Sequence, residues 1–446
     1  MSRSIDFTHG NIRCSLVQFA FPFFLISLIQ SMYNIADIMV VGRFCGNAGI
    51  AATSIAGSLT NSLTYAIIAL CNGGAIMVAQ YAGRKSSEDI LDTSSTLFSL
   101  SFVLAIAVSV LFYVLTPAIF HALNTPDAVF DSVQQYFRIC LTGFVFIFGY
   151  NALASIMRGL GDSRTPMYFA VASCLLNILL DLLLVGYMGM GIAGAAIATV
   201  ISQAASFFGF IVCLQVTGVT GFRLFPFRLN RHKALMILKL GIPGAVQNVV
   251  VSGGFLMVSS ITNTLGISAA SGVAVASKIN NICQMPADAI GTAASSMVGQ
   301  NVGSRNYDRA RQTMRSAIVI SLIIGIAAFI PVQIIPLRLL SLLTTDPDVL
   351  AQALPYLRVT SLDYLLVAMV FPLNALCNGS GHTMFTMIPS IVSSVIARVP
   401  VAAFCFSVLG LGITGVGIST PTGTTSAILI CTAYYLSNHW CSDTID

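Results

Sequence analysis

Charged residues are scarce in this chain of 446 residues: Asp, Glu, Lys and Arg together make up 8% of it, whereas hydrophobic residues make up 56%. A soluble domain carries about 25% charged residues, so a soluble fold of this length would need a polar surface that the sequence does not supply. Apolar runs such as 97–115 and 318–332 approach the length of about 20 residues with which a helix crosses a bilayer. The composition therefore indicates an all-α integral membrane protein.

Catalytic signatures are also missing. The chain has no P-loop, no G-x-S-x-G and no H-E-x-x-H motif, and its one glutamate, Glu88, lies in a predicted loop. The five histidines lack metal-ligand spacing, and the 11 cysteines include no C-x-x-C pair. We expect no enzyme activity, no cofactor, no resident metal and no nucleic-acid partner. Transport without a nucleotide site must draw on an ion gradient, where each charge is worth about 2.3 kcal/mol per 100 mV.

The chain repeats itself once, at a shift of about half its length. Matches follow the same order in both halves at a shift of 220 or 221 residues: 77–83 with 297–303, Tyr136 with Tyr356, Gly159 with Gly379, Pro22 with Pro243, Pro126 with Pro347, and Gly191 with Gly412. This ordered series indicates a duplicated unit. In a chain this apolar, a duplicated unit is typical of a transporter with two helical bundles and a cavity between them.

Twelve apolar stretches are predicted to form membrane helices, six in each half. They cover residues 15–40, 48–72, 93–115, 134–156, 166–187, 191–215, 235–262, 267–298, 315–336, 353–377, 385–407 and 411–436. Six helices return the chain to its starting side, so the two repeats are expected to lie parallel. We predict an N-terminal bundle in 1–217, a cytoplasmic linker in 218–234 and a C-terminal bundle in 235–446. The first stretch has no cleavage signature, so we interpret it as an uncleaved span.

Lysine and arginine are distributed unevenly between the two predicted sides of the membrane. One side holds Arg3, Arg13, Arg84, Lys85, Arg158, Arg164, Arg223, Arg228, Arg231, Lys233, Lys239, Arg305, Arg309, Arg311 and Arg315, and the other holds Arg43, Arg138, Arg338 and Arg358. Because positive charge stays on the cytoplasmic side, the first side is predicted to be cytoplasmic. We expect a multi-pass protein of the plasma membrane with both termini in the cytoplasm.

Acidic and amide side chains inside the predicted spans of the first half are the strongest functional signal. An aspartate at the centre of a membrane helix costs about 2.5–3.5 kcal/mol, so it is rarely without a role. Gln30, Asn34 and Asp37 follow the i, i+4, i+7 spacing of one helix face, and Asn177 and Asp181 are likewise one turn apart. Asn151 and Thr199 complete the candidate patch on neighbouring spans. Such a patch suits either a proton or Na⁺, and Na⁺ would be bound at Asp37, Asn177 and Asp181. There are two structural alternatives. Asp37 would only flank the outer end of its span, and Asp181 would make only a structural hydrogen bond.

The second half has its own charged residues within spans. Lys278 and Asp288 lie ten residues apart on one predicted helix, which is about 15 Å, so they cannot pair directly. Asp363 lies near the outer end of its span. We interpret Arg398 as a packing or snorkelling residue, and we place Lys278, Asp288 and Asp363 with Gln30, Tyr33 and Asn34 as candidate lining of a substrate cavity.

Several motifs resemble the MATE family of multidrug and toxic-compound extrusion transporters. They comprise Phe19-x-x-Pro22, Tyr33-Asn34-x-x-Asp37, Val78-Ala79-Gln80-Tyr81-x-Gly83, Arg158-Gly159-x-Gly161-Asp162, Gly241-Ile242-Pro243, Met297-Val298-Gly299-Gln300-Asn301 and Arg398-x-Pro400. Each motif is short, but the ordered set covers nearly the whole chain.

This resemblance implies a V-shaped arrangement of two six-helix lobes that rock between outward-facing and inward-facing states. It also implies efflux of amphipathic, often cationic, compounds in exchange for H⁺ or Na⁺. Asp37, Asn151, Asn177, Asp181 and Thr199 match the ion-coupling positions of the family's DinF-type branch. The NorM-type branch has a glutamate on the seventh span, near Val251 here, where this chain has no acid. The resemblance therefore favours the DinF-type branch.

Two other functions remain as alternatives. A flippase for lipid-linked oligosaccharides would present a more basic cavity, whereas only Lys278 and Arg398 are basic within the predicted spans. A channel would need a continuous polar stripe through several spans, and a membrane receptor would need an extramembrane domain; we find neither. The leading hypothesis is a secondary-active antiporter for small amphipathic or cationic compounds, and we expect a monomer because the sequence gives no sign of an oligomer.

Overall fold

The computed structural model describes residues 5–218 and 229–442, and every regular element within them is a helix. Each of the twelve predicted stretches coincides with a helix or with consecutive helical segments. Seven described helices are long and apolar enough to cross a membrane, and two bent pairs bring the number to nine. The 73-residue α1 contains two of the predicted spans, and α8 and α15 contain the remaining two.

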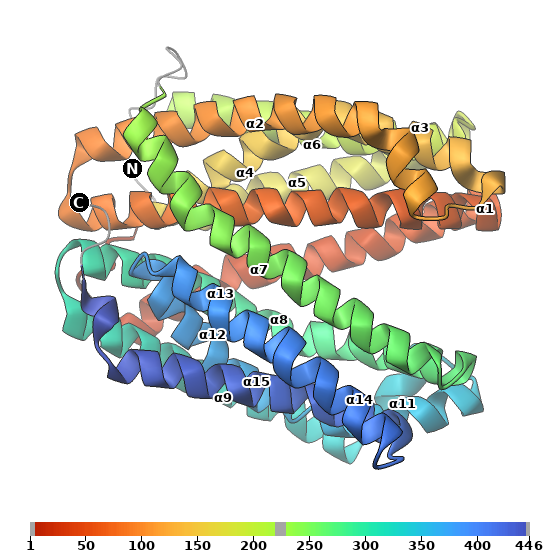
Figure 1. Cartoon of the computed structure of the whole chain (residues 1–446). Coiled ribbons are helices and arrows are strands. Elements are labelled where there is room, and N and C mark those ends of the chain that lie inside the picture. The colour runs from red at the N-terminus through yellow and green to blue at the C-terminus, as the bar shows by residue number, and fades with distance from the viewer. Residues whose placement is uncertain (1–4, 219–228, 443–446) are drawn as a thin grey trace. The chain divides into compact units, whose positions relative to one another are not determined.

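The helices follow the same order in both halves of the chain (Figure 1). The first half forms α1 (Ile12–Arg84), α2 (Ser87–Ala122), α3 (Asp127–Thr142), α4 (Phe144–Gly159), α5 (Arg164–Asp181), the π-helix η1 (Leu182–Tyr187) and α6 (Gly191–Thr217). The second forms α7 (Arg231–Asn263), α8 (Ile267–Gly303), α9 (Tyr307–Ile334), α10 (Pro336–Ser341), α11 (Pro347–Thr360), α12 (Asp363–Gly379), α13 (Thr383–Ile391), the π-helix η2 (Val392–Arg398), α14 (Val399–Ser407), α15 (Gly412–Leu436) and the 3-10 turn η3 (His439–Cys441). Each half contains one bent pair, α3–α4 at 47° and α11–α12 at 45°, as expected for a duplication.

A single glycine divides the long α1. Gly46 has φ 65° and ψ −165°, a backbone conformation that is open essentially to glycine alone. It separates the two membrane helices that the sequence predicts in 15–40 and 48–72. Any other residue at position 46 would be strained there.

The chain forms two compact units, and their membership differs from a simple division at the linker. The first unit contains Leu25–Gly241, and the second contains Asp6–Phe24 together with the chain from Ile242 on. The start of α1 therefore belongs to the second unit, and the start of α7 belongs to the first. Both helices change unit close to a proline inside the helix, Pro22 in α1 and Pro243 in α7, where an α-helix loses a backbone hydrogen bond and bends. The predicted boundary in 218–234 follows the repeat, whereas the units follow the contacts; most of that linker lies outside the described residues.

Polar contacts hold the start of α7 in the first unit. Nζ of Lys233 lies 2.8 Å from Oδ1 of Asp89 and 3.4 Å from Oδ2 of Asp92, and it lies over the ring of Tyr81. The Asn230 amide donates to the same Asp92 carboxylate at 2.8 Å. Because Lys233 is buried, its charge is compensated by these groups rather than by water.

An equivalent set of contacts holds the segment before α1 in the second unit. The guanidinium of Arg309 donates to the carbonyl oxygens of Phe7 (2.9 Å), His9 (2.6 Å) and Gly10 (2.9 Å). The backbone N–H of Phe7 donates to Gln300 (3.1 Å), and the Phe7 ring is fully buried. Both attachments lie at the predicted cytoplasmic ends of the helices.

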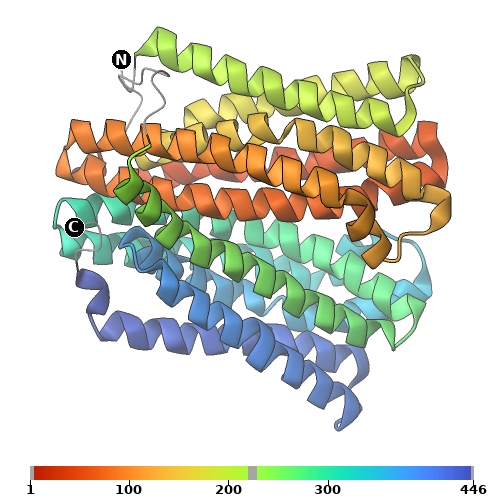
Figure 2. The same cartoon turned by 45° about the horizontal axis from the view of Figure 1, so that its top comes forward.

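Within each unit the long helices run side by side (Figures 1 and 2). In the first unit α6 packs against α3, α4 and α5, and in the second α8 packs against α9, α11 and α12. Small residues permit this close packing: a Cβ on Gly73 would lie 2.6 Å from the carbonyl oxygen of Ile237, and one on Gly241 would lie 2.7 Å from the backbone of Leu70. The candidate polar side chains are thus held on tightly packed helices.

Candidate functional site

The two acids that the sequence singles out in the first half come together in the first unit. Asp37 lies on α1 and is half-buried, and Asp181 is the last residue of α5 and is 1% exposed. Their carboxyl groups are neighbours that interact electrostatically. Oδ1 of Asp181 is buried and accepts no hydrogen bond from the described residues. The pair therefore presents an open acceptor inside the unit.

Asn177 joins this acid pair to α6. In the amide orientation that satisfies both of its ends, Nδ2 of Asn177 donates to Oδ2 of Asp181 at 2.8 Å and its oxygen accepts from the backbone N–H of Thr199 at 3.1 Å. Asn177 is 2% exposed. The Thr199 hydroxyl donates to the carbonyl oxygen of Ala195 at 3.0 Å, as threonines within helices often do.

Aromatic hydroxyls complete the cluster. Tyr33 lies one turn before Asp37 on α1, and its hydroxyl bonds the side chain of Thr199. The side chains of Tyr136 and Cys140 on α3 form a hydrogen bond with each other. Tyr136 also interacts electrostatically with Tyr33 and Asp37. Sequence reasoning did not include Tyr136 or Cys140 among the site residues, although the recurrence of Tyr136 as Tyr356 was a signal that could have identified the tyrosine.

Other predicted residues are not joined to the acid pair by hydrogen bonds. The Asn151 amide donates to the carbonyl oxygen of Ile147 on its own helix at 2.8 Å. Gln30 and Asn34 are exposed on the α1 face that carries Asp37. Their roles as coupling or cavity residues stay predictions.

The predicted charged residues of the second unit are spread out. Lys278 and Asp288 are exposed on α8, and in the part of the chain that the structure describes no carboxylate lies within 4 Å of the Lys278 ammonium. Asp363, in contrast, is 4% exposed at the start of α12, accepts a hydrogen bond from Gln284 (3.3 Å) and interacts with the side chain of Thr424. Arg398 is 7% exposed and lies within electrostatic reach of Asp363. Its burial fits the packing role, one of the two that the sequence suggested, and does not fit a snorkelling position.

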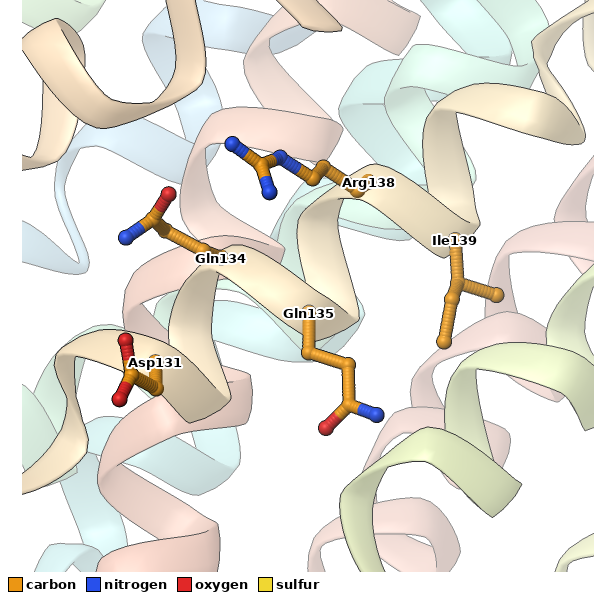
Figure 3. Close-up of a pocket in the computed structure, with 5 residues that line it drawn as sticks. All are labelled: Asp131, Gln134, Gln135, Arg138 and Ile139. Atoms are coloured by element: carbon orange, nitrogen blue, oxygen red, sulfur yellow. The ribbon is translucent and has the colours of Figure 1, made fainter.

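A hollow of about 330 Å³ lies along α3 (Figure 3). Its lining residues, drawn in Figure 3, are Asp131, Gln134, Gln135, Arg138 and Ile139. They follow a different face of α3 from the buried Tyr136 and Cys140. The hollow is therefore separate from the acid pair, and its side chains combine one acid, one base and two amides.

The acid pair and its neighbours can hold a small cation but do not form a transition-metal centre. Among the described residues no group of three His, Cys, Asp or Glu side chains is placed to hold a metal ion. The oxygens of Asp37, Asp181, Tyr33 and Thr199 are hard ligands of the kind that alkali cations prefer, and two adjacent carboxyl groups also suit one shared proton.

Comparison with known proteins decides the family. The family model MatE matches residues 22–183 and again 243–404, and the second match begins 221 residues after the first. The chain belongs to the MatE family. This double match also confirms the duplication that the sequence predicts.

Relatives of this MatE protein match it over nearly its whole length. The chain is 27% identical over 446 residues to the probable multidrug resistance protein YpnP of Bacillus subtilis, covering 98% of each chain. It is 25% identical over 441 residues to the probable multidrug resistance protein NorM of Thermotoga maritima, covering 96% of this chain and 93% of that one. A solved multidrug resistance MATE family transporter of the MOP superfamily, in an outward-facing conformation, matches with a TM-score of 0.93 and 21% identity over the full length of both chains.

These matches confirm the all-α, two-bundle membrane fold and place the chain in a family whose matched relatives are named as multidrug resistance proteins and transporters. They do not separate the DinF-type from the NorM-type branch, so the DinF-type assignment stays a prediction.

Proposed function

We propose that this MatE protein is a secondary-active antiporter that exports amphipathic, cationic compounds in exchange for H⁺ or Na⁺. The coupling ion binds at Asp37 and Asp181. We propose further that the protein works as a monomer in the plasma membrane, with both termini cytoplasmic, and alternates between two states by rocking of its helical bundles. The observation that carries the proposal is the meeting of two carboxyl groups in an apolar unit.

The acid pair lacks a fixed counter-charge. In the described part of the first unit, Arg and Lys side chains form no ion pair with Asp37 or Asp181. Two uncompensated carboxylates inside a membrane protein are costly. A bound proton or Na⁺ removes much of that cost, so the pair favours an exchangeable cation.

Asn177 can serve either ion. With a proton on the pair, its Nδ2 can donate to Asp181 at 2.8 Å in the amide orientation described above. With Na⁺ on the pair, a rotation of the amide would turn its oxygen toward the ion. The same residue therefore supports H⁺ and Na⁺ coupling, and only an experiment with imposed gradients separates them.

Coupling follows from differential affinity. An ion shifts the balance between two states only as far as it binds one of them more tightly. Binding at Asp37 and Asp181 links α1 to α5, and through Asn177 to α6. The packing of these three helices then depends on whether the ion is bound, which is the property that antiport requires.

Efflux of a fluorescent cationic dye from proteoliposomes tests this proposal. A pH gradient and a Na⁺ gradient are imposed separately on the wild type and on Asp37→Asn. We expect dye movement with one gradient and its loss in the variant. Movement at the wild-type rate in Asp37→Asn would refute coupling at this residue, and no movement with either gradient in the wild type would favour a lipid-linked or anionic cargo.

A further inference from the structure

The two repeats carry different residues at the position of the acid pair. At a shift of 221 residues, Asp37 corresponds to Val258 and Asp181 corresponds to Ala402. Val258 and Ala402 are buried members of one hydrophobic cluster that also contains Tyr356, the counterpart of Tyr136. The place that holds two acids in the first unit is therefore filled by apolar side chains in the second.

A fixed positive charge stands where the first repeat has an amide. Asn177 corresponds to Arg398 at the same shift, and its partner Thr199 corresponds to Thr420. Tyr356 bonds the Thr420 side chain and lies within electrostatic reach of Arg398. The second unit thus keeps the tyrosine and threonine of the cluster and exchanges its asparagine for arginine.

Local packing makes room for the guanidinium. Gly254, the counterpart of Tyr33, has no side chain, and a Cβ there would lie 2.9 Å from the carbonyl oxygen of Ser394 in η2. The next residue, Phe255, places its ring 4.5 Å from the guanidinium carbon of Arg398. Loss of the tyrosine therefore lets α7 approach η2 and brings an aromatic face to the arginine, a contact that stabilises a desolvated cation.

Asp363 is the acid that balances this charge. It interacts electrostatically with Arg398, although the two groups form no ion pair within 4 Å in the described chain. Nε of Arg398 and Oδ1 of Asp363 are both buried and without a hydrogen-bond partner among the described residues. Their opposite charges partly compensate each other, since leaving either one alone in this interior would be costly.

We infer that Arg398 acts as a tethered cation: it takes, in the second unit, the place that the exchangeable ion takes in the first, so that Asp363 binds no exchangeable ion. This inference rests on the proposed function, because it assigns the coupling ion to the first unit alone. Arg398 is a specificity-determining residue in this sense, since it sets how many ions the protein exchanges. Substitution by the residue of the first repeat, Arg398→Asn, should turn Asp363 into a second ion-binding acid.

Labelling with dicyclohexylcarbodiimide tests this. The reagent is apolar and reacts with protonated carboxyl groups in membrane proteins, and mass spectrometry locates the adduct. In wild-type protein in detergent we expect an adduct on Asp37 or Asp181 and none on Asp363. Arg398→Asn should gain an adduct on Asp363, whereas Arg398→Lys, which keeps the charge, should not.

The outcomes separate this inference from the proposed function. An adduct on Asp363 in the wild type, or none on Asp363 in a folded Arg398→Asn variant, would overturn the tethered cation. If Arg398→Asn does not fold, the wild-type protein and Arg398→Lys still decide, because an adduct on Asp363 in either contradicts the inference. Absence of labelling at both Asp37 and Asp181 in Na⁺-free, mildly acidic solution, where the pair should carry a proton whichever ion it couples, would instead contradict the proposed function, whatever happens at Asp363.

Discussion

Asn177 donates a hydrogen bond of 2.8 Å to Asp181, one turn further along α5. The same amide accepts from the backbone of Thr199, so a single side chain connects an acid to the neighbouring α6. Through Asp181 the connection extends to Asp37 on α1. A substitution that breaks one of these contacts should therefore affect the carboxyl pair.

Removing this amide should change ion binding at Asp181. A hydrogen bond to a charged group is worth about 1.5–3 kcal/mol and favours the ion-free carboxylate, so with H⁺ as the coupling ion Asn177→Ala should lower the proton concentration needed for half-maximal dye efflux by about 10- to 100-fold. With Na⁺ as the coupling ion, loss of the amide oxygen should raise the Na⁺ concentration needed. The measurement is the rate of efflux from proteoliposomes against the concentration of the coupling ion. Asn151→Ala is the matched control, because that amide bonds only its own helix and its loss should have a smaller effect. Equal effects of the two substitutions would contradict the role given to Asn177.

Close packing of α1 on α7 predicts a large effect from a single methyl group. A Cβ at Gly73 would meet two backbone atoms, at 2.6 and 2.8 Å, and backbone cannot move aside as a flexible side chain can. Gly73→Ala should therefore destabilise the protein by about 1–3 kcal/mol, seen as a lower Tm in detergent. Gly57→Ala is the control, since nothing lies within 4 Å of its added Cβ, and it should be neutral or slightly stabilising. A Gly73→Ala protein as stable as the control would mean that these helices are further apart.

Arg309 should govern the order of the segment before α1. Its guanidinium donates to three backbone carbonyls of residues 7–10. Arg309→Ala removes all three bonds, so amide hydrogen exchange in residues 6–11 should become faster by about 10- to 100-fold. Hydrogen-exchange mass spectrometry measures this directly. Arg309→Lys, which keeps one charged donor group, should give an intermediate rate, and an unchanged rate in both variants would show that the burial of Phe7 alone holds the segment.

The end of the described chain should respond to acid. Burial lowers the pKa of His382 below its usual value, and repulsion from His439 lowers it further, whereas a hydrogen bond with the Ser380 backbone opposes them. Neutral His382 accordingly stabilises this contact fully above the ordinary histidine pKa of about 6.5, and the stabilisation declines below that value and is lost as pH falls through the lowered pKa of the folded state. His382 contacts Ser442 at 3.0 Å, next to the fully buried Trp440.

Trp440 is the single tryptophan of the chain, so its fluorescence reports on this contact. We expect the emission to shift to longer wavelength between pH 7.5 and pH 5.5 in the wild type, to about the extent that solvent exposure of an indole produces. His382→Gln, which has no charge to gain, should show a smaller shift. A shift of the same size in both proteins would place the pH response elsewhere.

The sequence alone predicted the helices and the side chains that share a helix face, because both depend on local spacing. Apolar runs of membrane length predict helices, and the i, i+4 spacing of Tyr33 with Asp37 and of Asn177 with Asp181 sets which side chains share a face. The double family match bears out the duplication. Hydropathy is a weaker predictor of membrane spans for α8 and α15, which are not among the helices apolar enough to cross a membrane by composition alone. Both helices pack extensively against other helices of the second unit.

Contacts between distant segments were beyond the sequence. Nothing local indicates that residues 6–24 pack with the second unit, because that depends on the bend near Pro22 and on Arg309, almost 300 residues away. The burial of Arg398 beside Asp363 likewise depends on the π-helical turn η2 and on the absence of a side chain at Gly254. The periodicity of the sequence predicts neither the packing of residues 6–24 nor the burial of Arg398.

Displacement of the coupling ion by cargo tests the central claim most directly. Tetraphenylphosphonium, an amphipathic cation, is added to the purified protein in weakly buffered detergent solution, while a pH dye and a Na⁺-selective electrode record the two ions. Antiport at the acid pair predicts release of one of them from the wild type and from Asp363→Asn, and a large loss of that release in Asp37→Asn. Binding of the cation to the wild type without release of either ion, or equal release from Asp37→Asn, would contradict it.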